Sequence, residues 1–179
     1  MRLIHVLVVG AALASVAHAE VADSSATGFT VKFTVNVQAP PADAYRKFVR
    51  NVGDWWSSDH TFSHDAHNLS IEEKAGGCLC EKLPEGGGVR HLEVVNFAPG
   101  KQLVMSGGMG PLQSLATAGS LTIRFTPADG GTKVDVVYTV VGYLAAGMNT
   151  WAAPVNGMLT ETFDRFRNYV ERGDPTRAK

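Results

Sequence analysis

Residues 150–171 read TWAAPVNGMLTETFDRFRNYVE and predict a long amphipathic helix near the C-terminus. Most of their apolar side chains recur at intervals of three and four residues, which places them on one face of a helix. These residues are Trp151, Val155, Met158, Leu159, Phe163, Phe166 and Val170. Gly173 and Pro175 should end the helix, because neither residue favours its continuation. The apolar face needs a partner surface, which the preceding sequence provides.

Alternating apolar residues upstream of this helix predict β-strands. The clearest strand, residues 28–37, reads GFTVKFTVNV, with every second side chain apolar. A short helix that starts at Pro40-Pro41 and ends near Arg50, then a helical turn with Trp55-Trp56, should follow it. Short connections favour antiparallel pairing, so the sequence predicts an α+β domain. Six further strands are expected at about 69–74, 78–83, 88–97, 101–106, 120–126 and 132–143.

The first 19 residues read MRLIHVLVVGAALASVAHA and are typical of a secretory signal peptide. We expect cleavage after Ala19 and a periplasmic or secreted protein. The apolar stretch is too short for a permanent membrane anchor, so no stable membrane insertion is expected. Residues 20–27 are small and polar and should form a flexible N-terminus. The domain should then span 28–173, with a tail at 174–179.

Composition narrows the function classes. The 179 residues include 16 Lys+Arg and 17 Asp+Glu, giving a formal net charge of −1. Non-specific nucleic-acid binding depends on neutralising phosphates with basic side chains, so nucleic acid is not an expected partner. The sequence also lacks a dinucleotide fingerprint, a phosphate loop and a zinc-protease motif, and no cofactor is expected.

Four segments carry a family resemblance: VQAPPADAY at 37–45, DWW at 54–56, AGGCLCE at 75–81 and FAPGKQL at 97–103. With the C-terminal helix they cover about residues 29–171. In this order they resemble the START-like, or SRPBCC, superfamily, in particular its polyketide cyclase/dehydrase and Hsp-ATPase-activator-like branch. The resemblance implies a helix-grip fold, in which a seven-stranded antiparallel sheet wraps around a long C-terminal helix. It also implies a cavity between sheet and helix.

A small hydrophobic or amphipathic ligand is the expected occupant of this cavity, while no protein partner can be named from the sequence. Aromatic and methionine side chains dominate the walls of such sites. For each candidate ligand-binding residue named below, ordinary packing in the hydrophobic core is the alternative. A Gly-rich loop at 107–119 is either a gate over the cavity or a long turn. The candidate ligand-binding residues are Trp55, Trp56, Met105, Tyr138, Trp151, Val155 and Met158.

A cyclase-, dehydratase- or hydrolase-like enzyme using the same cavity is the alternative function. Its acid–base candidates are His91, Glu93 and Glu81, and strand alternation places His91 and Glu93 on one face. A carboxylate facing an apolar cavity would have its pKa raised, which suits general acid–base chemistry. The same residues could instead lie on a solvated face of the sheet.

A metal or redox module is the third hypothesis. Cys78 and Cys80 could be buried free thiols, a reducible disulfide or metal ligands. Regular strand geometry holds residues two apart too far from each other for a disulfide, which favours free thiols. His60, His64 and His67 lie close together in sequence and could join them in a zinc or copper site. Their spacing matches no closed structural-zinc pattern, so a solvated loop is the alternative.

Overall fold

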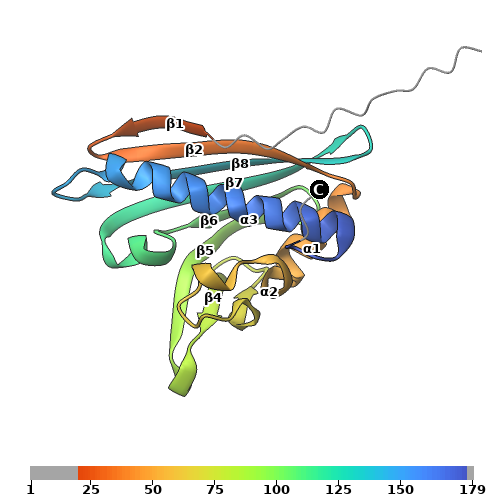
Figure 1. Cartoon of the computed structure of the whole chain (residues 1–179), viewed down its shortest axis with the longest axis horizontal. Helices are drawn as coiled ribbons and strands as arrows, with labels where there is room; N and C mark the ends of the chain where they lie inside the picture. Colours follow the sequence, from red (N-terminus) through yellow and green to blue (C-terminus); the bar gives the residue numbers. More distant parts are fainter. Residues whose placement is uncertain (1–19, 177–179) are drawn as a thin grey trace, which may run out of the picture.

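The structure, a computed structural model, describes residues 20–176, so the expected signal peptide lies outside the described residues. Its sheet has eight strands in the order β1-β2-β8-β7-β6-β5-β4-β3, and every neighbouring pair is antiparallel. Figure 1 shows the sheet curving around the C-terminal helix α3. The strands are β1 (Glu20–Ser25), β2 (Gly28–Val37), β3 (Leu69–Ile71), β4 (Cys78–Lys82), β5 (Gly88–Ala98), β6 (Gln102–Ser106), β7 (Ala116–Ala128) and β8 (Gly131–Tyr143).

Two short helices and several 3₁₀ turns accompany α3 (Ala152–Arg172). Helices α1 (Pro41–Arg50) and α2 (Val52–Trp55) follow β2 and lie beside the C-terminal half of α3 (Figure 1). Gly173, in the left-handed conformation with a φ of 72°, ends α3 as predicted. No helix within the described residues is long and apolar enough to cross a membrane. The 3₁₀ turns are η1 (Ser58–His60), η2 (Ala66–Asn68), η3 (Pro84–Gly86), η4 (Gly110–Ser114) and η5 (Met148–Trp151).

The predicted α+β helix-grip architecture is confirmed, with one strand more than the expected seven. The extra strand is β1, formed by residues 20–25 of the segment expected to be a flexible N-terminus. All its side chains are exposed, so it carries no alternating apolar pattern. Backbone pairing with the edge of β2 forms this strand, and such pairing leaves no signal in side-chain polarity.

The core lies between the concave face of the sheet and the apolar face of α3. Phe33 of β2 packs edge-on against Phe163 of α3, with ring centroids 4.8 Å apart. Phe48 of α1 stacks on Phe163 and contacts Trp55 of α2, whose ring also meets Phe166. The aromatic cluster therefore fills the space under the C-terminal half of α3. Trp151 and Met158, near the N-terminal end of the helical segment, are only partly buried.

Strand β5 contains two irregularities that reset which side chains face inward. Relative to β4 it has one additional residue, His91, because Leu79 pairs with Leu92 while Cys80 pairs with Arg90. Both His91 and Leu92 are consequently buried, although they are adjacent in sequence. A second irregularity skips Val95 in the pairing with β6. The bulge at His91 moves this side chain to the inner face of the sheet.

Candidate functional site

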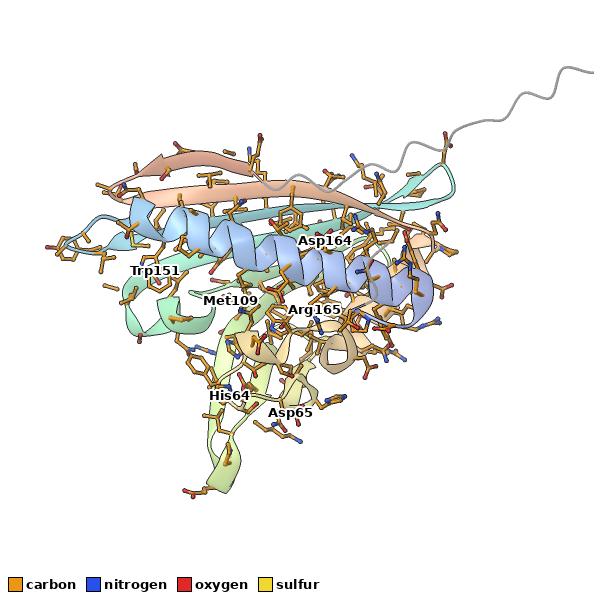
Figure 2. All side chains as sticks on the ribbon, in the orientation of Figure 1. His64, Asp65, Met109, Trp151, Asp164 and Arg165 are labelled. Carbon is orange, nitrogen blue, oxygen red and sulfur yellow. A yellow bond between two sulfur atoms is a disulfide. The ribbon has the colours of Figure 1, made fainter. Side chains whose placement is uncertain are left out.

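A cavity of ≈ 310 Å³ lies between the start of α3, the segment around η1, the loop before β7, and His91 of β5. This volume is at the lower end of small-molecule sites, so it suits a compact ligand. Figure 2 shows Trp151 and Met109 close to the N-terminal half of α3. The lining residues are Trp56, Asp59, His60, Thr61, Phe62, His91, Met109, Gly110, Pro111, Leu112, Trp151, Pro154, Val155 and Met158.

The wall around Trp56 is fixed to α3 by hydrogen bonds. Arg165 donates from Nε to the Trp55 carbonyl (3.0 Å) and from Nη2 to the Trp56 carbonyl (3.1 Å). The indole Nε1 of Trp56 donates to the His60 carbonyl at 3.2 Å. The Arg165 guanidinium thereby places a positive charge beside the carbonyls at the C-terminal end of α2, where it is favourable. Together these contacts hold the Trp56 ring against the cavity.

The Gly-rich loop supplies the opposite wall, and Tyr138 of β8 anchors it. The buried Tyr138 hydroxyl donates to the Gly107 carbonyl at 3.1 Å and accepts from the Met109 amide at 2.9 Å. Burial raises the pKa of Tyr138 to about 12, so the hydroxyl keeps its proton. Gly110 has a φ of 59°, which glycine adopts without steric cost. Tyr138 thus positions Met109 without lining the cavity itself.

The buried polar pair of the site is formed by Glu81 and His91. His91 Nε2 lies 2.8 Å from Glu81 Oε2, and the two side chains are 5% and 0% exposed. The backbone amides of Phe62 and Ser63 also donate to this carboxylate. Burial alone would raise the pKa of the Glu81 carboxyl, but hydrogen bonds from Ser63, His91 and Phe62 outweigh it and lower the pKa. Glu81 is therefore a carboxylate at neutral pH.

The ionised state of Glu81 determines the tautomer of His91. A carboxylate only accepts hydrogen bonds, so Nε2 of His91 must carry the shared proton. In the neutral ring Nδ1 is then a bare acceptor, and no described residue donates to it. The Phe62 ring stacks nearly parallel on the imidazole, with centroids 5.8 Å apart and planes 13° apart. The wall of the cavity thus offers an oriented nitrogen acceptor beside the apolar residues of the lining.

The structure brings together four of the seven candidate ligand-binding residues. Trp56, Trp151, Val155 and Met158 line the cavity. The adjacent tryptophans diverge, and Trp55 points into the aromatic core with 0% exposure. The other two candidates, Met105 and Tyr138, are fully buried in the core and do not line this cavity.

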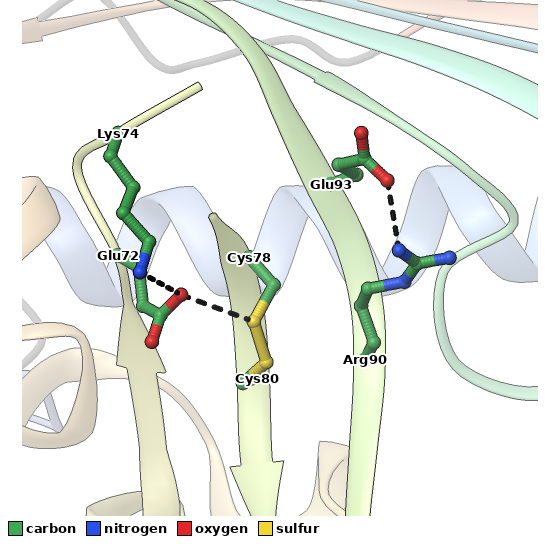
Figure 3. Close-up of a disulfide and its surroundings, with 6 residues drawn as sticks. All are labelled: Glu72, Lys74, Cys78, Cys80, Arg90 and Glu93. Atoms are coloured by element: carbon green, nitrogen blue, oxygen red, sulfur yellow. Dashed lines mark hydrogen bonds and ion pairs between the residues drawn. A yellow bond between two sulfur atoms is a disulfide. The ribbon is translucent and has the colours of Figure 1, made fainter. Parts of the chain in front are cut away.

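Of the acid–base candidates, Glu81 and His91 meet and Glu93 does not join them. The expectation that His91 and Glu93 share a face is wrong, because the bulge at His91 shifts the alternation by one residue. Glu93 instead accepts from Arg90 at 2.8 Å on the outer face of the sheet (Figure 3). A raised pKa, expected for a carboxyl facing an apolar cavity, does not occur at Glu81, since peptide amides surround it.

Sequence reasoning missed Phe62, Pro154 and Arg165. Phe62 lies in a polar, histidine-rich segment, where a lone aromatic residue resembles a surface side chain. It is 48% exposed and yet covers His91. Met109 was noted only as part of a possible gate, and the glycines around it were the available signal.

The metal candidates do not form a cluster. His60 Nε2 pairs with Glu161 Oε2 at 3.0 Å, and His67 Nδ1 pairs with Asp65 Oδ1 at 2.9 Å. His64 lies on the lower part of the molecule in Figure 2, away from α3. Within residues 20–176 no group of three or more His, Cys, Asp or Glu side chains is arranged to hold a metal ion.

Cys78 and Cys80 form a disulfide on the outer face of β4 (Figure 3). The expectation of buried free thiols is therefore wrong. Their Cα atoms are 5.2 Å apart, which is within the range that a disulfide spans. Regular strand geometry was a poor guide here, although the pairing of β4 with β5 also has a register shift between Leu79 and Cys80. Glu72, paired with Lys74 at 3.5 Å, lies beside Cys78.

Comparisons with known proteins establish the fold. No protein-family model matches the chain, and no curated protein sequence matches it. An uncharacterised protein from Rhizobium leguminosarum superposes with a TM-score of 0.58 at 17% identity, covering 88% of this chain and 99% of its own. Ara h 8.0201, a START/SRPBCC structure, gives 0.56 at 18%, covering 80% and 97%. CalU16 from Micromonospora echinospora gives 0.52 at 13%, covering 83% and 78%. These neighbours confirm the predicted helix-grip fold.

Proposed function

We propose that this chain, which has the helix-grip fold of START-like proteins, binds a compact apolar or amphipathic molecule between its sheet and α3. One observation carries the proposal: the cavity joins largely apolar walls to a buried polar group held by a hydrogen bond, the imidazole of His91. Sites that bind small molecules combine these two features, since apolar contact supplies affinity and a few polar groups fix orientation. Trp56, Trp151 and Met158 provide the apolar contact.

We further propose that binding takes place outside the cytoplasm. Residues 1–19 support this because they have the sequence of a secretory signal peptide. The Cys78–Cys80 disulfide supports it independently, since disulfides persist mainly in oxidising compartments. An exported binder would meet its ligand in the periplasm or the medium.

Native mass spectrometry of the protein purified from its own compartment tests the proposal directly. We expect an added mass that disappears when the same sample is denatured. If the purified protein carries no ligand, binding is measured instead by titration with the apolar fluorophore N-phenyl-1-naphthylamine. The Trp151→Ala variant should bind the fluorophore at least about tenfold more weakly, because it removes a large part of the apolar wall.

A matched variant shows whether the fluorophore occupies the cavity. Tyr143 lies on β8, is 76% exposed and does not line the cavity, so Tyr143→Ala should leave binding unchanged. Equal loss in both variants would indicate surface adsorption. The binding proposal fails when the purified protein carries no ligand and wild type shows no saturable uptake of the fluorophore.

The Glu81–His91 pair supports a second candidate function, an enzyme of the cyclase, dehydratase or hydrolase type. A histidine held by a buried carboxylate is an arrangement that general-base catalysis uses. Here Nδ1 of His91 would take the proton and Glu81 would position the ring. Hydrolysis of 2-naphthyl acetate provides a test of the hydrolase form. Turnover that His91→Ala abolishes, with probe binding retained, would favour the enzyme.

A further inference from the structure

We infer that the ligand of this cavity carries an acidic hydroxyl, of phenol or enol type, which donates its hydrogen bond to Nδ1 of His91. The inference rests on the proposed binding function and adds the chemical class of the ligand. It follows from the hydrogen bonds around Glu81 and from the composition of the cavity wall.

The first step is the direction of the bond between Glu81 and His91. The amide of Phe62 donates to Oε2 of the Glu81 carboxyl and the amide of Ser63 donates to Oε1, while Nε2 of His91 lies 2.8 Å from Oε2. Hydrogen bonds from backbone amides to both oxygens stabilise the ionised carboxyl, in line with the lowered pKa of Glu81. Because that form cannot donate, the proton between the two side chains belongs to Nε2.

The second step is that Nδ1 needs a donor from outside the chain. Among the described residues nothing donates to it, although the ring is 5% exposed and otherwise enclosed. Nδ1 is not among the fully buried unpartnered atoms of the described residues, so it is accessible from the cavity that His91 lines, and a ligand donor there gains a hydrogen bond with it. Phe62 covers one face of the ring, which leaves approach in the ring plane from the cavity.

The third step uses the number of donors and the charge of the ligand. A hydroxyl has one donor for the one acceptor, whereas a primary ammonium would bury further donors without partners. A carboxylate or sulfonate has no proton to give and would approach the negative charge of Glu81. Of the other charged or titratable groups of the lining, Asp59 is a further carboxyl, and Nε2 of His60 is engaged by Glu161 at 3.0 Å.

The hydroxyl of the ligand should be acidic. The O–H of a phenol or enol is more polarised than that of an aliphatic alcohol, so it donates a stronger hydrogen bond to a neutral nitrogen acceptor. The Glu81 carboxylate, which accepts from Nε2, makes Nδ1 on the same ring a better acceptor. The apolar wall with Trp56 and Trp151 suits the flat ring of such a ligand.

Calorimetric titration with two probes of the same ring system tests the inference. The probes are 2-naphthol, which has the hydroxyl, and 2-methoxynaphthalene, in which a methyl group replaces the donor hydrogen. Wild type should bind 2-naphthol at least about tenfold more tightly, as expected for one hydrogen bond to a desolvated acceptor. In His91→Phe the two probes should bind within about twofold of each other, while Tyr143→Phe should keep the wild-type ratio.

The outcomes separate the inference from the function on which it rests. Equal binding of both probes by wild type overturns the inference and leaves the binding function standing. Tighter binding of 2-naphthoate than of 2-naphthol also overturns it, because the site would then select an anion. Failure of all three probes to bind counts against the binding function itself. The ratio of the affinities for 2-naphthol and 2-methoxynaphthalene is measured on wild type alone, so the test holds even when His91→Phe does not fold.

Discussion

His91 meets Glu81 at 2.8 Å although His91 is the residue that the β4–β5 ladder skips. Without the bulge, His91 would alternate with Leu92 and face the outer side of the sheet. The bulge turns both side chains inward, which places the imidazole against the carboxylate of the neighbouring strand. Bulges often re-aim a side chain beside a functional site, and here the whole polar group of the cavity depends on one.

The lowered pKa of Glu81 predicts how stability changes in acid. Its usual value is 4.5, and the folded-state value is lower. The carboxylate therefore stabilises the fold above the unfolded-state pKa, and this contribution is lost as pH falls through the folded-state pKa. Glu81→Gln should lower the free energy of unfolding at pH 7 by about 1–3 kcal/mol, since an amide cannot accept all three hydrogen bonds.

Urea denaturation of wild type and Glu81→Gln between pH 7 and pH 3 provides the measurement. The difference between the two proteins should shrink towards low pH, where Glu81 also loses its charge. Asp65 and Asp135, whose pKa values are lowered as well, affect both proteins equally. A difference that stays constant over this range would contradict the assigned charge of Glu81.

Substitution of Trp55 and of Trp151 should separate stability from binding. Trp55→Ala removes a ring with 0% exposure from the aromatic core and should cost about 3–5 kcal/mol of stability. Trp151→Ala removes a partly buried ring of the cavity and should cost much less, while it weakens probe binding. Urea denaturation and fluorophore titration on both variants check this. A folded Trp55→Ala variant with the larger loss of affinity would show that the cavity is placed wrongly.

Tyr138→Phe should loosen the Gly-rich loop. The variant removes the acceptor of the Met109 amide and the donor to the Gly107 carbonyl, at an expected cost of about 1–3 kcal/mol. Hydrogen exchange at the Met109 amide should accelerate, with little change in the core strands. Tyr143→Phe is the control, because Tyr143 is largely exposed. Unchanged exchange at Met109 would mean that the loop is held by other contacts.

Periodicity alone predicted much of the fold. The alternation in β2 and the spacing in α3 report burial directly, because each element has one apolar face. It could not reveal β1, whose side chains are all exposed and whose pairing uses the backbone. Nor could it locate the bulge at His91, since the side chains on either side still look like an ordinary strand.

The site was harder to predict because it is made by tertiary contacts. Trp56, Trp151, Val155 and Met158 were found because large apolar residues on a helix or loop are visible in sequence. The Glu81–His91 pair joins two strands, and the Phe62 ring comes from a third segment. Glu93 illustrates the limit of predicting a strand face from alternation, because a single additional residue in β5 places it on the opposite face from His91.

The last prediction concerns the disulfide and tests whether a change on the outer face of the sheet affects the cavity on the inner face. Thiol counting on protein purified without reductant should find no free cysteine, since Cys78 and Cys80 are joined. Replacing both by serine should lower the free energy of unfolding by only about 1.5 kcal/mol, because the closed loop is very short. Affinity for 2-naphthol should change less than about twofold, as the disulfide lies on the outer face, beside Arg90 and Glu93 rather than in the cavity (Figure 3). A larger loss of affinity would show that the disulfide holds the bulge that places His91.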